Sequence, residues 1–197
     1  VPKDGERYFA LVKVDRVNGV TPEENKHKIM FENLTPLFPK ERFNLEREKF
    51  KGEENITGRI VDLVAPIGKG QRALLVAQPK TGKTIMMQHI AHALVANHPE
   101  VHLILLLIDE RPEELTYFRR TVAAEVFASS SDQSPAEHTA LAELLLAHIR
   151  IELECGNDIV VLLDSLTRLA RAFNLSQNPG RGRSSGAGRS LSGGMDA

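Results

Sequence analysis

The sequence predicts an α/β fold with a mostly parallel sheet. Two nearly continuous apolar runs, residues 101–109 and 159–163, have the length and composition of strands buried on both faces. Residues 84–97 carry apolar side chains at helical spacing and directly precede the first of these runs. Strands that alternate with helices imply βαβ units, whose strands pair in parallel.

Other segments add elements to this framework. Residues 72–77 predict a short buried strand, residues 113–124 a helix, and residues 126–129 a short strand. Residues 134–137 read Ser-Pro-Ala-Glu, which combines a capping box with proline at the first helical position, so a helix should run from there to about residue 154. Towards the N-terminus, residues 8–14 suit a strand, and the charge-rich residues 41–54 suit a linker.

Size and composition limit the class of protein. A chain of 197 residues fits one good-sized domain, or one domain and part of another. The net charge of −1 gives no global sign of nucleic-acid binding, so any such contact must come from local patches. Cys155 is the single cysteine, which excludes an internal disulfide and fits a reducing compartment. With an apolar run over residues 103–108 that is too short for a membrane span, we expect a cytoplasmic protein.

Both ends of the chain have the features of cut ends. Val1 leads directly into a predicted strand, and the last 20 residues are rich in Gly, Ser and Arg, as in a loop. The sequence therefore leads us to expect a piece of a longer polypeptide.

A phosphate-binding loop is predicted at residues 77–84, Ala-Gln-Pro-Lys-Thr-Gly-Lys-Thr, between a predicted strand and an apolar helix. Gly82 lets the backbone approach phosphate oxygens, and the helix N-terminus favours an anion. Lys83 can reach the outer phosphates of a nucleotide, and the Thr84 hydroxyl can bind Mg²⁺. Ala77 stands where the common pattern has Gly, so the motif depends on its context.

Acidic side chains end two of the predicted strands. Asp164 closes the run 159–163 in the manner of a Walker B aspartate, which would place it near Thr84 and the metal ion, because ligands bind at the carboxyl ends of parallel strands. Glu110 follows the run 101–108, and we choose it as the carboxylate that orients the water molecule that attacks the γ phosphate. We assign a structural role to the neighbouring Asp109. For Arg111, a phosphate contact and a surface ion pair are equally compatible with the spacing.

Several longer motifs resemble those of the Rho family of bacterial transcription termination factors. They are residues 106–114 (LLIDERPEE), 162–172 (LLDSLTRLARA), 66–72 (PIGKGQR), 6–11 (ERYFAL) and 31–37 (FENLTPL). They occur in the family's order and extend over nearly the whole chain. In this family the phosphate loop usually opens with Ala, which accounts for Ala77.

The resemblance implies a RecA-like P-loop NTPase domain at residues 56–197 that is truncated at its C-terminus. It would follow the remnant of an OB or cold-shock-type RNA-binding domain at residues 1–20 and a connector at residues 21–55. It also implies an ATP- and Mg²⁺-dependent enzyme with Glu110, Lys83, Asp164 and Arg168 in catalysis, Arg168 linking the ATP site to an RNA channel, and Thr84 and Asp164 at the metal ion. The implied nucleotide-binding residues are Gly68, Lys69, Gly70, Gln71, Arg72, Ala73, Lys80, Thr81, Gly82, Lys83, Thr84, Ile85 and Arg111.

RNA contacts are implied at both ends of the chain. Glu6, Arg7 and Tyr8 match the last RNA-contacting element of the family's primary site, although Tyr8 read alone is more often a core aromatic. Residues 189–194 resemble the loop that touches RNA in the central channel, or else are a plain linker. Its implied contacts are Arg189, Ser192, Gly193 and Gly194. The stretch 177–187 is longer than the family's usual loop, so the register of Arg189 is open.

The sequence as a whole favours an RNA-dependent ATPase and 5′-to-3′ RNA–DNA helicase that ends transcription. The resemblance implies a homohexameric ring, nascent RNA as a partner, and RNA polymerase with elongation factors as further partners. One alternative is another RecA-like ring ATPase, such as a rotary ATPase subunit, whose ATP hydrolysis RNA would not stimulate. A second alternative is a nucleotide-binding regulatory module without turnover, against which Glu110 and Asp164 argue.

Overall fold

A computed structural model of the chain describes residues 13–17, 21–47, 52–78 and 80–177. Three strands form a parallel sheet in the order β2-β1-β3, with bounds β1 His102–Glu110, β2 Glu125–Ser130 and β3 Ile159–Asp164. The helices are α1 Glu53–Val64, α2 Lys83–Asn97, α3 Pro112–Thr121, α4 Pro135–Glu154 and α5 Leu166–Gln177. Two short 3-10 helices, η1 Glu24–His27 and η2 Phe31–Asn33, come first in chain order. The predicted α/β class with a parallel sheet is confirmed.

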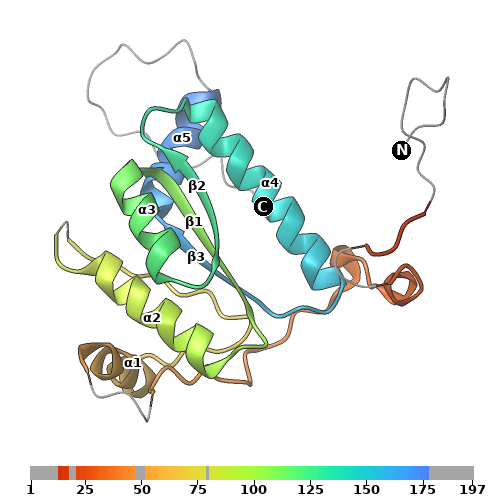
Figure 1. Cartoon of the computed structure of the whole chain (residues 1–197), viewed down its shortest axis with the longest axis horizontal. Helices are drawn as coiled ribbons and strands as arrows, with labels where there is room; N and C mark the ends of the chain where they lie inside the picture. Colours follow the sequence, from red (N-terminus) through yellow and green to blue (C-terminus); the bar gives the residue numbers. More distant parts are fainter. Residues whose placement is uncertain (1–12, 18–20, 48–51, 79, 178–197) are drawn as a thin grey trace.

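The central strand β1 is buried on both faces, as its unbroken apolar composition predicts. Leu103, Leu105 and Leu107 pack in one core with side chains of α2 and α3, whereas the alternate residues Ile104 and Ile108 pack in a second core with α4. The sheet therefore lies between two helical layers, with α4 and α5 on one side of it and α2 and α3 on the other (Figure 1).

Helix α4 begins as predicted. The Ser134 hydroxyl accepts a hydrogen bond from the backbone N–H of Glu137, and the Glu137 carboxylate accepts one from the backbone N–H of Ser134. This capping box satisfies backbone groups that the first turn of a helix leaves open. At the other end of α4, the Glu154 carboxylate accepts hydrogen bonds from Lys28 Nζ at 2.9 Å and from the backbone N–H of Phe31 at 3.1 Å. Residues 28–31 are thus fastened to the C-terminus of α4.

The predicted linker at residues 41–54 is wrong in part, because its middle belongs to the core. Phe43 and Leu45 are buried against α2, and Leu45 is only 1% exposed. The Asp62 carboxylate of α1 accepts hydrogen bonds from the backbone N–H groups of Leu45 and Glu46 at 2.9 and 2.8 Å. Among the described residues of this segment, Glu41 and Arg42 are exposed whereas Phe43 and Leu45 are buried, so the high proportion of charge concealed its role in the core.

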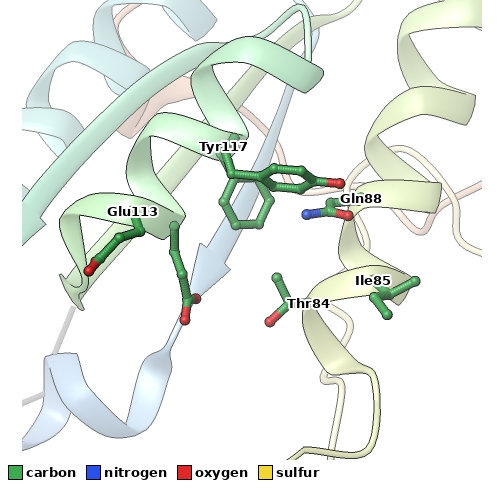
Figure 2. Close-up of a pocket in the computed structure, with 7 residues that line it drawn as sticks. Thr84, Ile85, Gln88, Glu113 and Tyr117 are labelled. Atoms are coloured by element: carbon green, nitrogen blue, oxygen red, sulfur yellow. The ribbon is translucent and has the colours of Figure 1, made fainter.

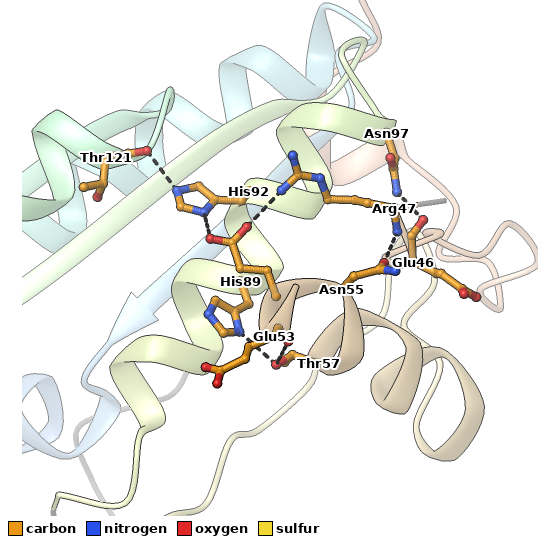
Figure 3. A network of polar contacts seen from close by, with 10 residues as sticks. Glu46, Arg47, Glu53, Asn55, Thr57, His89, His92, Asn97 and Thr121 are labelled. Carbon is orange, nitrogen blue, oxygen red and sulfur yellow. Dashed lines mark hydrogen bonds and ion pairs between the residues drawn. The ribbon is translucent and has the colours of Figure 1, made fainter. Parts of the chain in front are cut away.

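A polar network joins α1 to α2 beside this segment (Figure 3). The His92 ring lies between the Glu54 carboxylate, at 3.2 Å, and the Thr121 carbonyl oxygen at the end of α3, at 2.9 Å. Arg47 donates to the other oxygen of Glu54 at 2.9 Å, and His89 contacts the Thr57 hydroxyl at 2.8 Å. Three helices and the segment before α1 are therefore linked through side chains of α2.

The predicted strand at residues 72–77 is not formed. This segment has no regular secondary structure, and Leu74 and Val76 are 70% and 86% exposed. A strand needs a partner for its backbone ladder, but the described residues pair β3 only with β1. A cavity of about 840 Å³ separates residues 67–77 from β3 instead. The predicted helix at residues 113–124 is shorter than expected and ends at Thr121, since the chain must turn into β2.

We expect Gly58→Ala to destabilise the fold. A Cβ atom at Gly58 would lie 2.2 Å from the Leu45 carbonyl oxygen, which is backbone and cannot swing away. Overpacking of this kind typically costs about 1–3 kcal/mol. Urea unfolding of the variant and the parent chain measures the difference. Gly156→Ala is a useful comparison, because a Cβ there meets nothing within 4 Å, so any loss comes from its φ of 85° and not from crowding. Equal stability of Gly58→Ala and the parent chain would contradict the close contact.

Candidate nucleotide site

The turn before α2 is shaped for an anion. Gly82 has φ of 93°, in the left-handed region that favours glycine, and a Cβ there would meet nothing within 4 Å. No side chain caps the N-terminus of α2, and its first turn holds no acidic residue. Open backbone N–H groups at a helix N-terminus attract phosphate oxygens. Lys83 and Thr84 occupy the first turn of this helix.

Lys83 meets the end of β3. Its ammonium group donates a hydrogen bond to the carboxylate of Asp164, which is the last residue of that strand and is buried. The two residues are 81 positions apart in sequence, and the parallel sheet brings them together, as expected for acids at the carboxyl ends of strands. The structure therefore joins the phosphate loop to the Walker B-like aspartate.

A β-bulge at Asp109 lies directly before Glu110, the second acidic residue of the predicted site. The ladder between β1 and β2 shifts between Ile108 and Glu110, and Asp109 has φ of 56°. The register shift breaks the regular alternation of side chains at the end of β1, just before Glu110.

Glu110 is 6% exposed and faces Arg168 of α5. The Arg168 guanidinium donates to the Glu110 carboxylate at 2.6 Å and also to the backbone carbonyl oxygen of Asp109. Burial and the neighbouring Glu114 carboxyl raise the pKa of Glu110, the positive charge of Arg168 lowers it, and the net result is a pKa of about 7. A carboxylate with a pKa near neutrality can accept and release a proton at physiological pH.

A cavity of about 410 Å³ opens between α2 and α3 next to these groups (Figure 2). Thr84 lies at its edge, and the Tyr117 ring extends from α3 towards Gln88 of α2 (Figure 2). The residues that line the cavity are Thr84, Ile85, Gln88, Glu113, Glu114, Tyr117 and Phe118. The Thr84 hydroxyl is thus accessible to a bound ion.

The structure does not bring all predicted nucleotide-binding residues to this place. Lys69 forms ion pairs with Asp158, at 2.6 Å, and Glu41, at 3.3 Å. Asp158 precedes β3, so the segment 68–71 lies by the end of that strand opposite Asp164, about 20 Å away at the usual strand rise. Residues 68–71, Ala73 and Lys83 line different parts of the 840 Å³ cavity.

The other predicted contacts are spread around the turn. Lys80, Thr81 and Ile85 are exposed near Gly82, and the Thr81 hydroxyl donates to the Gln78 carbonyl oxygen at 2.7 Å. Arg111 is exposed at the N-cap of α3, directly after Glu110. Arg72 is exposed in the segment that separates from β3. Their roles at a nucleotide remain predictions.

The predicted RNA contacts lie outside the described residues. These are Glu6, Arg7, Tyr8, Arg189, Ser192, Gly193 and Gly194. The same holds for the predicted remnant of an OB-type domain, of which only residues 13–17 are described within positions 1–20.

The groups around Thr84 fit Mg²⁺ bound together with a nucleotide. Mg²⁺ usually takes one or two protein ligands and completes its shell with phosphate oxygens and water. Thr84 and Asp164 offer such a sparse set next to the open turn at Gly82. In the described part of the chain, no three His, Cys, Asp or Glu side chains gather into a metal-binding group, so an all-protein metal cage is not found there. None of the helices in that part could cross a membrane either.

Comparison with known proteins shows the family. The model of the ATP synthase alpha/beta family, nucleotide-binding domain, matches residues 58–179, which contain α2, β1, β3 and the side chains gathered above. The chain belongs to this family. The match also confirms the predicted RecA-like P-loop fold. Members of this family share a nucleotide-binding domain, which agrees with the open turn at Gly82 and its lysine.

Curated relatives of the chain are transcription termination factors, as the resemblance of the motifs predicts. The chain is 60% identical over 196 residues to the transcription termination factor Rho of Chromobacterium violaceum. It is 55% identical over 197 residues to that of Neisseria gonorrhoeae, and 54% identical over 196 residues to that of Pseudomonas aeruginosa. Each alignment covers 100% of this chain and 45% of the relative, so the chain spans somewhat less than half the length of these curated relatives. The predicted resemblance to the Rho family is confirmed.

Sequence reasoning overlooked the wall of the smaller cavity. Gln88, Glu114 and Tyr117 were not among the predicted site residues, although Gln88 follows Thr84 by four positions and thus shares its helix face. Glu114 follows Glu110 by four positions as well, but the turn between β1 and α3 hides this proximity. The helical spacing after Thr84 is the signal that would have found Gln88.

Proposed function

We propose that this chain forms the ATP-binding and ATP-hydrolysing part of an RNA-dependent ATPase that terminates transcription in the cytoplasm. The observation that carries the proposal is the meeting of Lys83, Asp164 and the Glu110–Arg168 pair beside the open turn of α2. The names of the relatives supply the biological process, because they are transcription termination factors.

The phosphates of ATP would occupy the turn at Gly82. The backbone N–H groups of the first turn of α2 would hold the phosphate oxygens, and Lys83 would exchange its contact with Asp164 for one with the outer phosphates. Thr84 and Asp164 would hold Mg²⁺, which supplies positive charge against the negative charge that develops during phosphoryl transfer. Mg²⁺ would then replace Lys83 as the positive partner of the buried Asp164 carboxylate.

Glu110 would activate the attacking water. In the proposed reaction, the water oxygen bonds to the γ-phosphorus, the bond to the bridging oxygen of ADP breaks, and a water proton passes to the Glu110 carboxylate. Arg168 holds this carboxylate in place through its bond of 2.6 Å, and it also ties Glu110 to α5. A raised pKa suits this role, since a base with a pKa near 7 both takes up and returns the proton at neutral pH.

We further propose that hydrolysis drives 5′-to-3′ movement along RNA in a homohexameric ring, with RNA polymerase and elongation factors as partners. The support is the similarity of motifs over the whole chain to termination factors, including the segments with Glu6, Arg7 and Tyr8 and with Arg189. Arg168 connects the ATP site to α5, and the segment with Arg189 follows α5 in the sequence.

RNA stimulation of ATP hydrolysis tests this function. A rotary ATPase subunit would share the family and the phosphate loop, but its hydrolysis would not depend on RNA. We expect a chimera, in which this chain replaces the matching segment of the Chromobacterium violaceum relative, to hydrolyse ATP with cytosine-rich RNA and very little without it. The unaltered relative serves as the control. Hydrolysis at the same rate with and without RNA would favour a rotary-type ATPase and refute the proposal.

A further inference from the structure

Gln88 is a buried polar side chain without a protein partner. It is 7% exposed in the middle of the second turn of α2, and its amide forms no hydrogen bond with any residue in the described part of the chain. In the described residues, the fully buried side-chain polar atoms without a partner are Asp62 Oδ1 and Arg150 Nε, so the Gln88 amide itself reaches accessible space. The partner of Gln88 must therefore come from the space that it faces.

That space is the 410 Å³ cavity between α2 and α3 (Figure 2). Its volume is many times the roughly 30 Å³ that one water molecule occupies in the liquid. The carboxylates of Glu113 and Glu114 and the hydroxyl of Thr84 contribute polar walls to it. Such walls can hold water, and Figure 2 shows the Gln88 amide further along α2 than Thr84, near the Tyr117 ring, with both side chains at the same cavity.

The spacing of Thr84 and Gln88 allows one water molecule to contact both the Gln88 amide and a metal ion at Thr84. Residues four apart on a helix have Cβ atoms about 5–6 Å from each other on one face. Mg²⁺ holds its own ligands at about 2.1 Å, and a water in that shell reaches its next partner over about 2.8 Å, so an outer partner lies about 4–5 Å from the ion. An amide one turn after the metal-binding hydroxyl falls within this range.

We propose that Gln88 is a positioning residue that holds water in the hydration shell of a divalent cation bound at Thr84. The inference rests on the proposed function, since the cation accompanies the nucleotide there. The amide can donate to one water and accept from another, which fixes the orientation of both. Outer-shell groups of this kind tune metal binding without touching the ion, and their loss commonly weakens it by about 10- to 100-fold.

The test compares the Mg²⁺ requirement of nucleotide binding in three versions of the chain. A fluorescent, non-hydrolysable ATP analogue is titrated at fixed Mg²⁺ concentrations and again in EDTA. Gln88→Met keeps the length of the side chain and removes both polar groups, whereas Gln88→Glu retains two acceptors for water. Thermal unfolding of each version shows whether it is folded, and Gln88→Ala provides a second apolar variant if Gln88→Met is not.

We expect Gln88→Met to raise the Mg²⁺ concentration at half-maximal effect by about 10-fold or more, with unchanged affinity in EDTA. Gln88→Glu should remain close to the parent chain. An unchanged Mg²⁺ requirement in Gln88→Met overturns the inference and leaves the proposed function standing. Equal weakening with Mg²⁺ and with EDTA also overturns it, because Gln88 would then act through packing alone. Failure of the parent chain to bind the analogue would refute the proposed function itself, and the inference with it.

Discussion

Lys83→Ala is expected to lose productive binding of ATP. The lysine supplies the mobile positive charge at the open turn of α2, and its contact with Asp164 places it directly beside that turn. A hydrogen bond to a charged group contributes about 1.5–3 kcal/mol, which corresponds to roughly a 10- to 100-fold loss of affinity. Titration of the chain with a fluorescent ATP analogue in the presence of Mg²⁺ measures the change.

The loss of Lys83 also leaves the buried Asp164 carboxylate without its partner, so destabilisation must be separated from lost binding. The double variant Lys83→Ala/Asp164→Ala removes both charges and serves as the control. Its unfolding midpoint should recover towards that of the parent chain, whereas its affinity for the nucleotide should not. Affinity at the parent level in Lys83→Ala would remove the phosphate-loop assignment.

Glu110→Gln should keep nucleotide binding and lose turnover. The amide preserves the size of the side chain and can still contact Arg168, but it cannot accept a proton from water. Removal of a general base typically lowers the rate by a factor of about 10² to 10⁴. ATP hydrolysis in the chimera described above measures the rate, and binding of the analogue shows that the site is intact.

Two comparisons make this result specific to Glu110. Asp109→Asn is the matched change at the neighbouring acid, and Asn tolerates the positive φ of 56° at that position, so its effect should be small. The pH profile is the second comparison. Because Glu110 must be ionised to act as a base, the parent rate should rise as pH increases through about 7, and the variant should lack this rise. A larger loss in Asp109→Asn than in Glu110→Gln would assign the base to Asp109.

The predictable parts of the fold are those in which local pattern and burial agree. The apolar run that became β1 is buried on both faces, and the capping box at Ser134 fixes the start of α4 from neighbouring residues alone. The run that became β3 also forms a strand, but the prediction that it is buried on both faces is wrong, because its apolar residues are half-buried and Val161 is 39% exposed. Lys83 and Asp164 could be placed together because parallel strands present their carboxyl ends at one edge.

The remaining features depend on contacts that a local pattern does not contain. The bulge at Asp109 depends on the register of β1 against β2, which the periodicity of the sequence does not reveal, yet it changes the backbone just before Glu110. Residues 72–77 have the composition of a strand, but without a ladder partner among the described residues they stay irregular. The burial of Leu45 follows from its packing near Gly58, which lies 13 positions later in the sequence.

Helix α4 is held by hydrogen bonds near each of its ends. Its N-terminus follows the turn after β2, where the backbone N–H of Ser131 donates to the Glu110 carbonyl oxygen at 3.2 Å. At its C-terminus, Glu154 accepts hydrogen bonds from Lys28 and from the backbone of Phe31. Twenty residues of α-helix span about 30 Å, so a tilt of about 5° moves the far end by roughly 3 Å. We therefore expect a displacement at the Glu110 end of the sheet to reach residues 28–31 through α4.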